Sequence, residues 1–169
     1  MFKKIVTTSI TLAALTLGSH ALAANYVGGN ISAMNYERDG VSDDADLVAL
    51  YGRLGTEFSE NFSGELRLGT GIDDDKIYGR KVKLNHMYGA YVRGGIPIAQ
   101  TFYPYAIVGV TRAKTKFGST SNTESDISLG LGTDIRMGNG LDLNLEYMNY
   151  LDKSRAQLDG FSIGLSKRF

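Results

Sequence analysis

Apolar and polar residues alternate at every second position in segments that recur from residue 25 to the end of the chain. Within residues 46–58, for instance, Leu50 and Leu54 share one phase and Arg53 lies on the other. Helical spacing is scarce in the same stretches. Because successive side chains of a strand point to opposite sides, this period predicts an all-β fold.

Eight segments show the pattern, and each is long enough for a tilted strand across a bilayer, which takes about 9 to 11 residues. We expect strands at residues 25–36, 46–58, 62–72, 81–94, 101–116, 125–137, 141–150 and 158–169. Longer polar connections at 37–45, 73–80, 117–124 and 152–157 alternate with shorter ones at 59–61, 95–100 and 138–139. This alternation of outer loops and inner turns predicts an eight-stranded antiparallel up-and-down transmembrane barrel.

The N-terminus has the three parts of a secretory signal peptide. The positive start MFKK precedes an apolar stretch at residues 5–20, and small residues follow at Ala21 and Ala23. A membrane-spanning helix is the alternative, but the apolar stretch is shorter than the roughly 20 residues that span a bilayer. We therefore expect a cleaved signal peptide at residues 1–23 and a barrel domain at residues 24–169.

The composition agrees with an exported barrel. The chain has no Cys and therefore no disulfide bond. It has 21 Gly but only 2 Pro. It has 10 Tyr and 7 Phe but no Trp. Glycines fit crowded barrel walls, and aromatic rings mark the membrane interfaces. The formal net charge is zero, so no basic face argues for nucleic acid.

Alternation alone does not distinguish a soluble barrel, whose apolar face points inward, from a membrane barrel, whose apolar face points outward. The export signal, the alternating connections and the apolar C-terminal strand favour the membrane barrel. Eight strands leave an interior that side chains fill, so charges there must pair with one another. The expected lumenal charge network is Arg53, Glu57, Glu65, Arg67, Lys83, Arg93, Asp134, Arg136, Asp142 and Glu146.

The segment 101–116 carries apolar residues on both phases. We expect Arg112 to face the lumen, although the opposite phase fits almost as well. The residues then expected to face lipid are Tyr103, Tyr105 and Ile107. On the polar phase of residues 125–137, Gly130 and Gly132 are expected to leave room for long arginine side chains.

The last nine residues, FSIGLSKRF, carry the strand pattern to the final residue. With the strand count and the loop pattern, they make the chain resemble the small eight-stranded outer-membrane barrels of Gram-negative bacteria, the OmpX, Ail and OmpA-barrel group. In that family the last strand addresses the chain to the barrel-assembly machinery. The residues that match this signal are Phe161, Ile163, Leu165 and Phe169, whereas Lys167 departs from it.

The resemblance implies an integral outer-membrane protein in contact with outer-membrane lipid and lipopolysaccharide. It favours a structural or surface-interaction role, such as adhesion, envelope integrity or defence, with host or surface ligands bound through four outer loops. A small porin-like pore is the alternative. Eight strands leave no continuous channel if the lumenal charges pair, because porins need about 16 strands.

A third alternative is a lipid A-modifying enzyme, since some eight-stranded barrels have that activity. His86 is the one histidine after residue 23, and we expect it on the lipid-facing phase with Leu84 and Tyr88. The segment NHMY lacks the His-x-Ser pattern of the lipid A deacylases. The acidic stretch from Asp73 lacks the spacing of a calcium loop. We expect no catalytic, cofactor or metal site.

Overall fold

The computed structural model describes residues 26–37, 45–73, 75–77, 80–117, 120–153 and 156–169. The expected signal peptide lies outside the described residues. The strands are β1 (Tyr26–Glu37), β2 (Ala45–Glu57), β3 (Phe62–Asp73), β4 (Asp75–Ile77), β5 (Arg80–Gly95), β6 (Phe102–Phe117), β7 (Thr120–Gly138), β8 (Leu141–Lys153) and β9 (Ala156–Arg168). Eight of them are long, and β4 has three residues. No helix among the described residues is long and apolar enough to cross a membrane.

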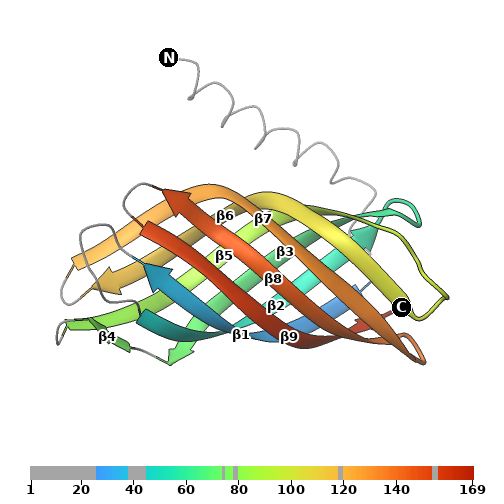
Figure 1. Ribbon diagram of the computed structural model, residues 1–169, viewed down its shortest axis with the longest axis horizontal. Helices are drawn as coiled ribbons and strands as arrows, with labels where there is room; N and C mark the ends of the chain where they lie inside the picture. The colour runs from blue at the N-terminus through green and yellow to red at the C-terminus, as the bar shows by residue number, and fades with distance from the viewer. Residues whose placement is uncertain (1–25, 38–44, 74, 78–79, 118–119, 154–155) are drawn as a thin grey trace, which may run out of the picture.

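The strands form one closed antiparallel barrel (Figure 1). Their order is β3-β2-β1-β9-β8-β7-β6-β5-β4, and an additional β3–β5 pairing closes the ring. β1 pairs with β9 from Tyr26 opposite Arg168 to Glu37 opposite Gln157, so both ends of the described chain meet at one end of the barrel. The predicted eight-stranded all-β barrel is confirmed.

The two ends of the barrel differ. The turn end carries the connections at 58–61, 96–101 and 139–140, and the outer end is the opposite one. The tightest turn places Gly138, Asn139 and Gly140 at φ of 94°, 54° and 72°, a region that favours glycine. At the outer end, most of the expected loops 117–124 and 152–157 is strand, which corrects that prediction. β6 and β7 pair as far as Phe117 and Thr120, so backbone pairing continues where polar sequence alone suggested loops.

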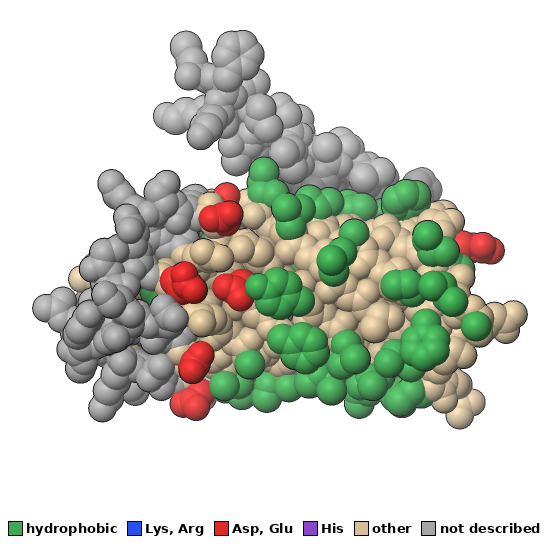
Figure 2. All heavy atoms as spheres, viewed as in Figure 1, with side chains coloured by type: hydrophobic (Ala, Val, Ile, Leu, Met, Phe, Trp, Pro, Cys, Tyr) green, Lys and Arg blue, Asp and Glu red, His purple; other side chains and the backbone are tan. Residues whose placement is uncertain are grey.

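The apolar face changes sides along the strands. Toward the turn end, apolar side chains such as Leu66 and Leu131 point outward and are 61% and 68% exposed. Toward the outer end, the inward side chains form an apolar cluster that includes Met34, Leu47, Leu84, Met87, Tyr150, Leu151 and Leu158. A band of hydrophobic side chains covers the wall, and acidic side chains stand at its outer edge on the face with β8 and β9 (Figure 2). The outer end is therefore built like a soluble barrel and the rest like a membrane barrel.

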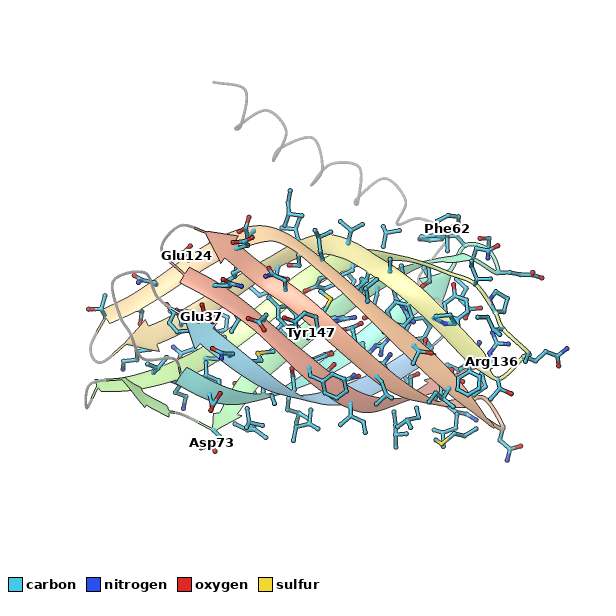
Figure 3. All side chains as sticks on the ribbon, in the orientation of Figure 1. Glu37, Phe62, Asp73, Glu124, Arg136 and Tyr147 are labelled. Atoms are coloured by element: carbon cyan, nitrogen blue, oxygen red, sulfur yellow. The ribbon has the colours of Figure 1, made fainter. Side chains whose placement is uncertain are left out.

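Labelled side chains show the same division (Figure 3). Phe62 and Arg136 lie near the turn end, and Glu37 and Asp73 lie near the outer end. Tyr147 lies on the wall between them and is 52% exposed. An aromatic ring at the edge of an apolar band is the usual marker of a membrane interface.

The phase expected for the segment 101–116 is wrong. Tyr105 and Ile107 point inward and are 4% and 1% exposed, whereas Arg112 is exposed on the outer wall. Tyr103, on the same phase, is half-buried and donates a hydrogen bond from its hydroxyl to the Asn61 carbonyl, 2.9 Å away. Inward tyrosines are favoured here because lumenal charged and polar groups satisfy their hydroxyls.

Because of a β-bulge in β5, the faces predicted for Lys83 and Leu84 are wrong. The register with β6 shifts between Leu84 and His86, so the residues on the two sides of the bulge follow different phases. Leu84 is fully buried inside the barrel, although it was expected to face lipid with His86. Lys83 consequently lies on the outer wall and is exposed, so it does not belong to the lumenal network.

Aromatic rings lie over glycines of the wall. A Cβ atom on Gly132 would meet the Tyr105 hydroxyl at 2.5 Å, and one on Gly55 would collide with the Tyr26 ring. Gly130 is covered by the Met148 side chain in the same way. The space expected for arginines at Gly130 and Gly132 is thus filled by Met148 and Tyr105, which corrects that prediction.

Candidate functional site: the barrel lumen

The lumen gathers six of the ten side chains of the expected charge network. The inward phases of five strands bring them together: Arg53 from β2, Glu65 and Arg67 from β3, Arg93 from β5, Asp134 from β7 and Glu146 from β8. They are three guanidinium groups and three carboxylates, so their formal charges cancel. All six are 9% exposed or less.

Glu65 is the centre of this cluster. Its Oε2 accepts hydrogen bonds from Arg53 Nη2 at 2.7 Å and from the Tyr26 hydroxyl at 2.6 Å, and Arg93 Nη1 lies 3.4 Å away. Its Oε1 accepts from Arg67 Nε at 2.5 Å. One carboxylate therefore balances parts of three guanidinium groups, the arrangement that buried charges require.

Glu146 holds the other side of the same cluster. Arg67 donates to it in a bidentate pair, with Nη1 to Oε1 at 2.6 Å and Nη2 to Oε2 at 2.7 Å. The Tyr105 hydroxyl donates to Oε2 at 2.8 Å. Bidentate arginine–carboxylate pairs are among the strongest and most directional contacts available to a protein. Arg67 consequently joins β3 to β8 across the lumen.

Asp134 completes the charge balance. It accepts a hydrogen bond from Arg93 Nη2 and another from Asn144 Nδ2 at 2.6 Å. Asn144 Oδ1 in turn accepts from Asn30 Nδ2 at 2.7 Å, so β1 also enters the network. The ring of hydrogen bonds therefore connects strands around the whole barrel.

Tyrosines line the network, and the sequence did not assign them to it. The Arg93 guanidinium lies over the Tyr105 ring with Cζ 3.7 Å from the centroid, and Arg67 lies over the Tyr91 ring at 4.7 Å. Cation–π contacts of this kind stabilise a desolvated guanidinium. Tyr26 could have been recognised because it shares the alternation phase of Asn30. For Tyr105, no signal in the sequence distinguished the two phases.

Two further layers close the lumen on the outer side of the charges. In the first, the Tyr91 hydroxyl bonds Thr111 at 2.6 Å, Thr111 bonds Ser128 at 2.5 Å, and Ser128 donates to the Tyr150 carbonyl at 3.0 Å. The second is the apolar cluster of the outer end, which includes Leu84, Met87 and Tyr150, all fully buried. Water and ions that crossed the lumen would have to pass both the neutralised charge cluster and the apolar cluster of the outer end.

Of the other four expected lumenal residues, Lys83 lies on the outer wall, and Glu57, Arg136 and Asp142 lie at the turn end. A cavity of about 420 Å³ opens there, and its lining includes Glu57, Arg93, Arg136, Asp142 and Arg168. Arg168 donates to both carboxylate oxygens of Asp142, at 2.7 and 2.6 Å, and lies 3.6 Å from Glu57. The cavity ends at the Arg93–Asp134 pair. Arg168, which the sequence did not place in the network, thus fixes the last strand to β8.

The described residues offer no catalytic or metal centre that the geometry would single out. No group of three or more His, Asp or Glu side chains among them could hold a metal ion. In the lumen each carboxylate of the six-residue cluster is engaged by arginine. A carboxylate held by guanidinium groups is poorly placed to act as a base, because its charge is already neutralised.

The last strand presents its alternate residues to the outside. Phe161, Ile163, Leu165 and Phe169 are 53%, 45%, 49% and 80% exposed. Lys167 shares their phase, and its Nζ donates to the Asn139 carbonyl in the β7–β8 turn. The inward residues of the same strand, such as Ser162, contact the lumenal network.

The sequence of residues 9–169 matches the outer membrane protein β-barrel domain family. The chain belongs to this family. Members are integral outer-membrane barrels, so the apolar band faces lipid, the turn end is periplasmic and the outer end faces the cell exterior. The alternative of a soluble barrel is thereby excluded. None of the curated proteins matches the chain.

Several solved outer-membrane proteins have the same fold at low sequence identity. Ail of Yersinia pestis superposes with a TM-score of 0.63 at 14% identity, over 85% of this chain and 97% of Ail. Neisserial surface protein A gives 0.61 at 16% identity, over 85% and 96% of the two chains. OprG of Pseudomonas aeruginosa gives 0.58 at 13% identity, over 87% and 96%. At such identities the likeness concerns the fold alone.

Proposed function

We propose that this family member is a sealed outer-membrane barrel with a structural or surface-interaction role, and that it is neither a pore nor an enzyme. The observation that carries the proposal is the double closure of the lumen. The cluster around Glu65 and Glu146 is neutral and each of its carboxylates pairs with an arginine, and the apolar cluster at Leu84 and Met87 excludes water beyond it. An ion would lose its hydration at both layers without gaining a ligand.

The protruding outer end is the surface that such a role would use. Its strands stand beyond the apolar band with polar side chains outward, and its apolar core gives it a fixed shape. One relative, Ail of Yersinia pestis, is known in complex with the heparin analogue sucrose octasulfate. For this chain we infer that ligands of the cell exterior, such as host or surface molecules, contact this outer end.

His86 offers little support for the enzymatic alternative. Its ring is exposed on the outer wall and stacks near Tyr88, with ring centroids 6.5 Å apart. Lys114 on β6 is directly opposite it. A nucleophile needs a base within hydrogen-bonding reach, and no described hydroxyl is hydrogen bonded to His86. The cation opposite it points instead to binding of anions.

The closed lumen predicts that the refolded protein does not conduct. In planar bilayers we expect no discrete current steps from the folded barrel, whereas a 16-stranded porin in the same bilayer gives them. The matched variant Arg136→Gln changes the charge of the periplasmic cavity without touching the cluster around Glu65. The proposal would be overturned if the wild type gave regular current steps and the variant gave steps of a different size. Such a result would show that the cavity leads into a channel.

We also propose that the last strand is the signal for the barrel-assembly machinery. Its outward row of apolar residues ends with Phe169, at the edge where β9 meets β1. Deleting Phe169 should reduce the amount of folded, heat-modifiable protein in the outer membrane. Phe102→Ala is the matched control, since Phe102 is also an outward aromatic at the turn end, 48% exposed. Equal loss in both variants, or none in the truncated chain, would contradict this role for the terminus.

A further inference from the structure

The outer wall of β5, β6 and β7 carries a basic surface that the lumen and the strand ends do not explain. Two cross-strand pairs put basic side chains together, Lys83 opposite Lys116 and His86 opposite Lys114, and in the next pair Arg112 lies opposite Tyr88. All six side chains lie on the outward face, and all but the half-buried Lys114 are exposed. We call the five basic residues the basic ladder.

Like charges directly opposite one another on a sheet are destabilising. Within the part of the chain that the structure describes, no ion pair links the basic ladder to a carboxylate. Of the exposed acidic side chains near the outer end, Glu37, Asp46 and Asp152 stand on β1, β2 and β8, away from the ladder, and Asp73 ends β3, which pairs with β5. The repulsion within the ladder therefore calls for an anionic ligand.

The third strand adds hydrogen-bond donors to the same surface. Ser121 pairs with Lys116, Thr123 with Lys114 and Ser125 with Arg112, and all three hydroxyl residues are exposed. Ammonium, guanidinium and hydroxyl groups together are the donors that bind phosphate oxygens.

Directly toward the turn end, the same three strands become apolar. The next outward row is Ala90, Val110 and Ile127, and the one after it contains Val92, Val108 and Leu129. At about 3.3 Å per residue, Arg112 and Val108 are roughly 13 Å apart along β6. The basic ladder therefore lies next to the outer edge of the apolar band, at the level of the lipid headgroups.

An apolar groove of about 570 Å³ lies in the apolar band, on the turn-end side of the basic ladder. Its lining includes Val92, Ala106, Val108, Leu129 and Leu131. The groove exists because Ala106 and Gly94, which are cross-strand partners, are smaller than their neighbours. The wall therefore has phosphate-binding groups at its outer end and an apolar groove within the membrane. A lipid with a phosphate group and an acyl chain would fit both.

We propose that the β5–β6–β7 wall binds a lipid of the outer leaflet whose headgroup carries phosphate, with the phosphate on the basic ladder and an acyl chain in the apolar groove. A sulfated polysaccharide has the anionic groups but no acyl chain, so it would leave the groove unexplained. The proposal rests on the placement of the barrel in the membrane and not on the role proposed for its outer end, so the two can fail separately.

The test is native mass spectrometry of the full barrel refolded in zwitterionic detergent. Three probes are added separately: lipid A with two phosphates, the same lipid A dephosphorylated, and inorganic phosphate. We expect the diphosphorylated lipid to bind at least about tenfold more tightly than the dephosphorylated one. A surface Lys or Arg contributes about fivefold to the binding of anionic lipid, so K83Q/R112Q/K116Q should weaken binding roughly a hundredfold.

Three single variants complete the test. Lys167→Gln removes the same charge from the outer wall at the turn end and should leave lipid A binding unchanged, whereas Lys116→Gln should weaken it about fivefold. Ala106→Phe fills the groove and should weaken binding of lipid A while all charges remain. All these side chains lie outside the lumen, and heat-modifiable migration checks that each variant is folded.

Three results would overturn the proposal. The first is equal binding of the phosphorylated and dephosphorylated lipids, or an unchanged affinity in the triple variant or in Ala106→Phe. The second is complete displacement of lipid A by inorganic phosphate at millimolar concentration, which would identify a phosphate site without a lipid. The third is heparin binding that is lost in the triple variant while lipid A binding persists.

Discussion

Replacing Glu65 with Gln will lower the free energy of unfolding of the barrel by about 3–5 kcal/mol, the cost of removing one partner from a buried ion pair. Gln keeps the size of the side chain and can still accept from the Tyr26 hydroxyl. It removes the charge that balances Arg53 and Arg67, whose side chains are fully buried. Burying a guanidinium group without a counter-charge is costly, and the other carboxylates of the cluster are already paired with Arg67 and Arg93.

The measurement is a urea titration of folding in phosphatidylcholine vesicles. The folded fraction at each urea concentration is the fraction of heat-modifiable protein. Glu57→Gln is the matched control, because Glu57 lies at the periplasmic cavity, its side chain is 45% exposed, and Arg168 is 3.6 Å away. An exposed pair contributes about 0–1 kcal/mol. If both variants lose the same stability, the lumen is hydrated in solution and the closed arrangement is wrong.

A double variant separates charge balance from packing. Arg53→Met in the Glu65→Gln background restores neutrality, because two guanidinium groups then face two carboxylates. We expect the double variant to be more stable than Glu65→Gln alone, which a double-mutant cycle detects as a coupling energy between the two sites. Stability losses that simply add would mean that Arg53 and Glu65 do not interact.

The strands could be predicted from the sequence because a closed barrel imposes alternation on every strand. In residues 125–137 the inward Asp134 and the outward Leu129 and Leu131 follow one unbroken period, and the structure keeps it. In β5 the period is interrupted by the bulge at Asn85, where one extra residue changes the phase. Nothing in the composition of that segment marks the bulge, so Lys83 and Leu84 were assigned to the wrong faces.

The reversal of polarity along the strands is present in the sequence but was not recognised there. At the start of β2, Leu47 and Ala49 lie on the same phase as Arg53 and are fully or almost fully buried, while Asp46 lies on the other phase and is exposed. Alternation gives the two faces of a strand but not the medium outside each one. The exposure of the side chains in the closed barrel, together with the outer-membrane family of the chain, places water around the outer end and lipid around the rest.

The lumenal charges could be predicted as a set but their partners could not. Arg67 and Glu146 are far apart in the sequence, and their bidentate contact depends on the closure of β3 on β5 and on the order of the strands. Tyr105 was missed because both phases of its strand are apolar and aromatic. The deciding interaction, its hydroxyl with Glu146 at 2.8 Å, joins β6 to β8 and exists only in the folded barrel.

Replacing Leu66 with Arg should also be strongly destabilising, for the opposite reason. Leu66 lies in the middle of the outward apolar run of β3, between Phe62 and Ile72, and is 61% exposed. A charge on the lipid face near the midplane of the bilayer costs about 2–4 kcal/mol, because the guanidinium must lose water or deform the bilayer. We expect this loss in the same urea titration, which measures the folded fraction in vesicles.

Asn122→Arg tests whether depth in the membrane, and not the new charge itself, causes the effect. Asn122 is exposed on β7 beyond the apolar band and pairs with the uncharged Thr115, and a surface substitution of this kind usually changes stability by less than about 0.5 kcal/mol. In detergent micelles, which deform more easily than a bilayer, the penalty at Leu66 should shrink while Asn122→Arg stays near zero. Equal effects at the two positions in vesicles would mean that the band at Leu66 does not face lipid, and the boundary between membrane and outer end would have to be moved.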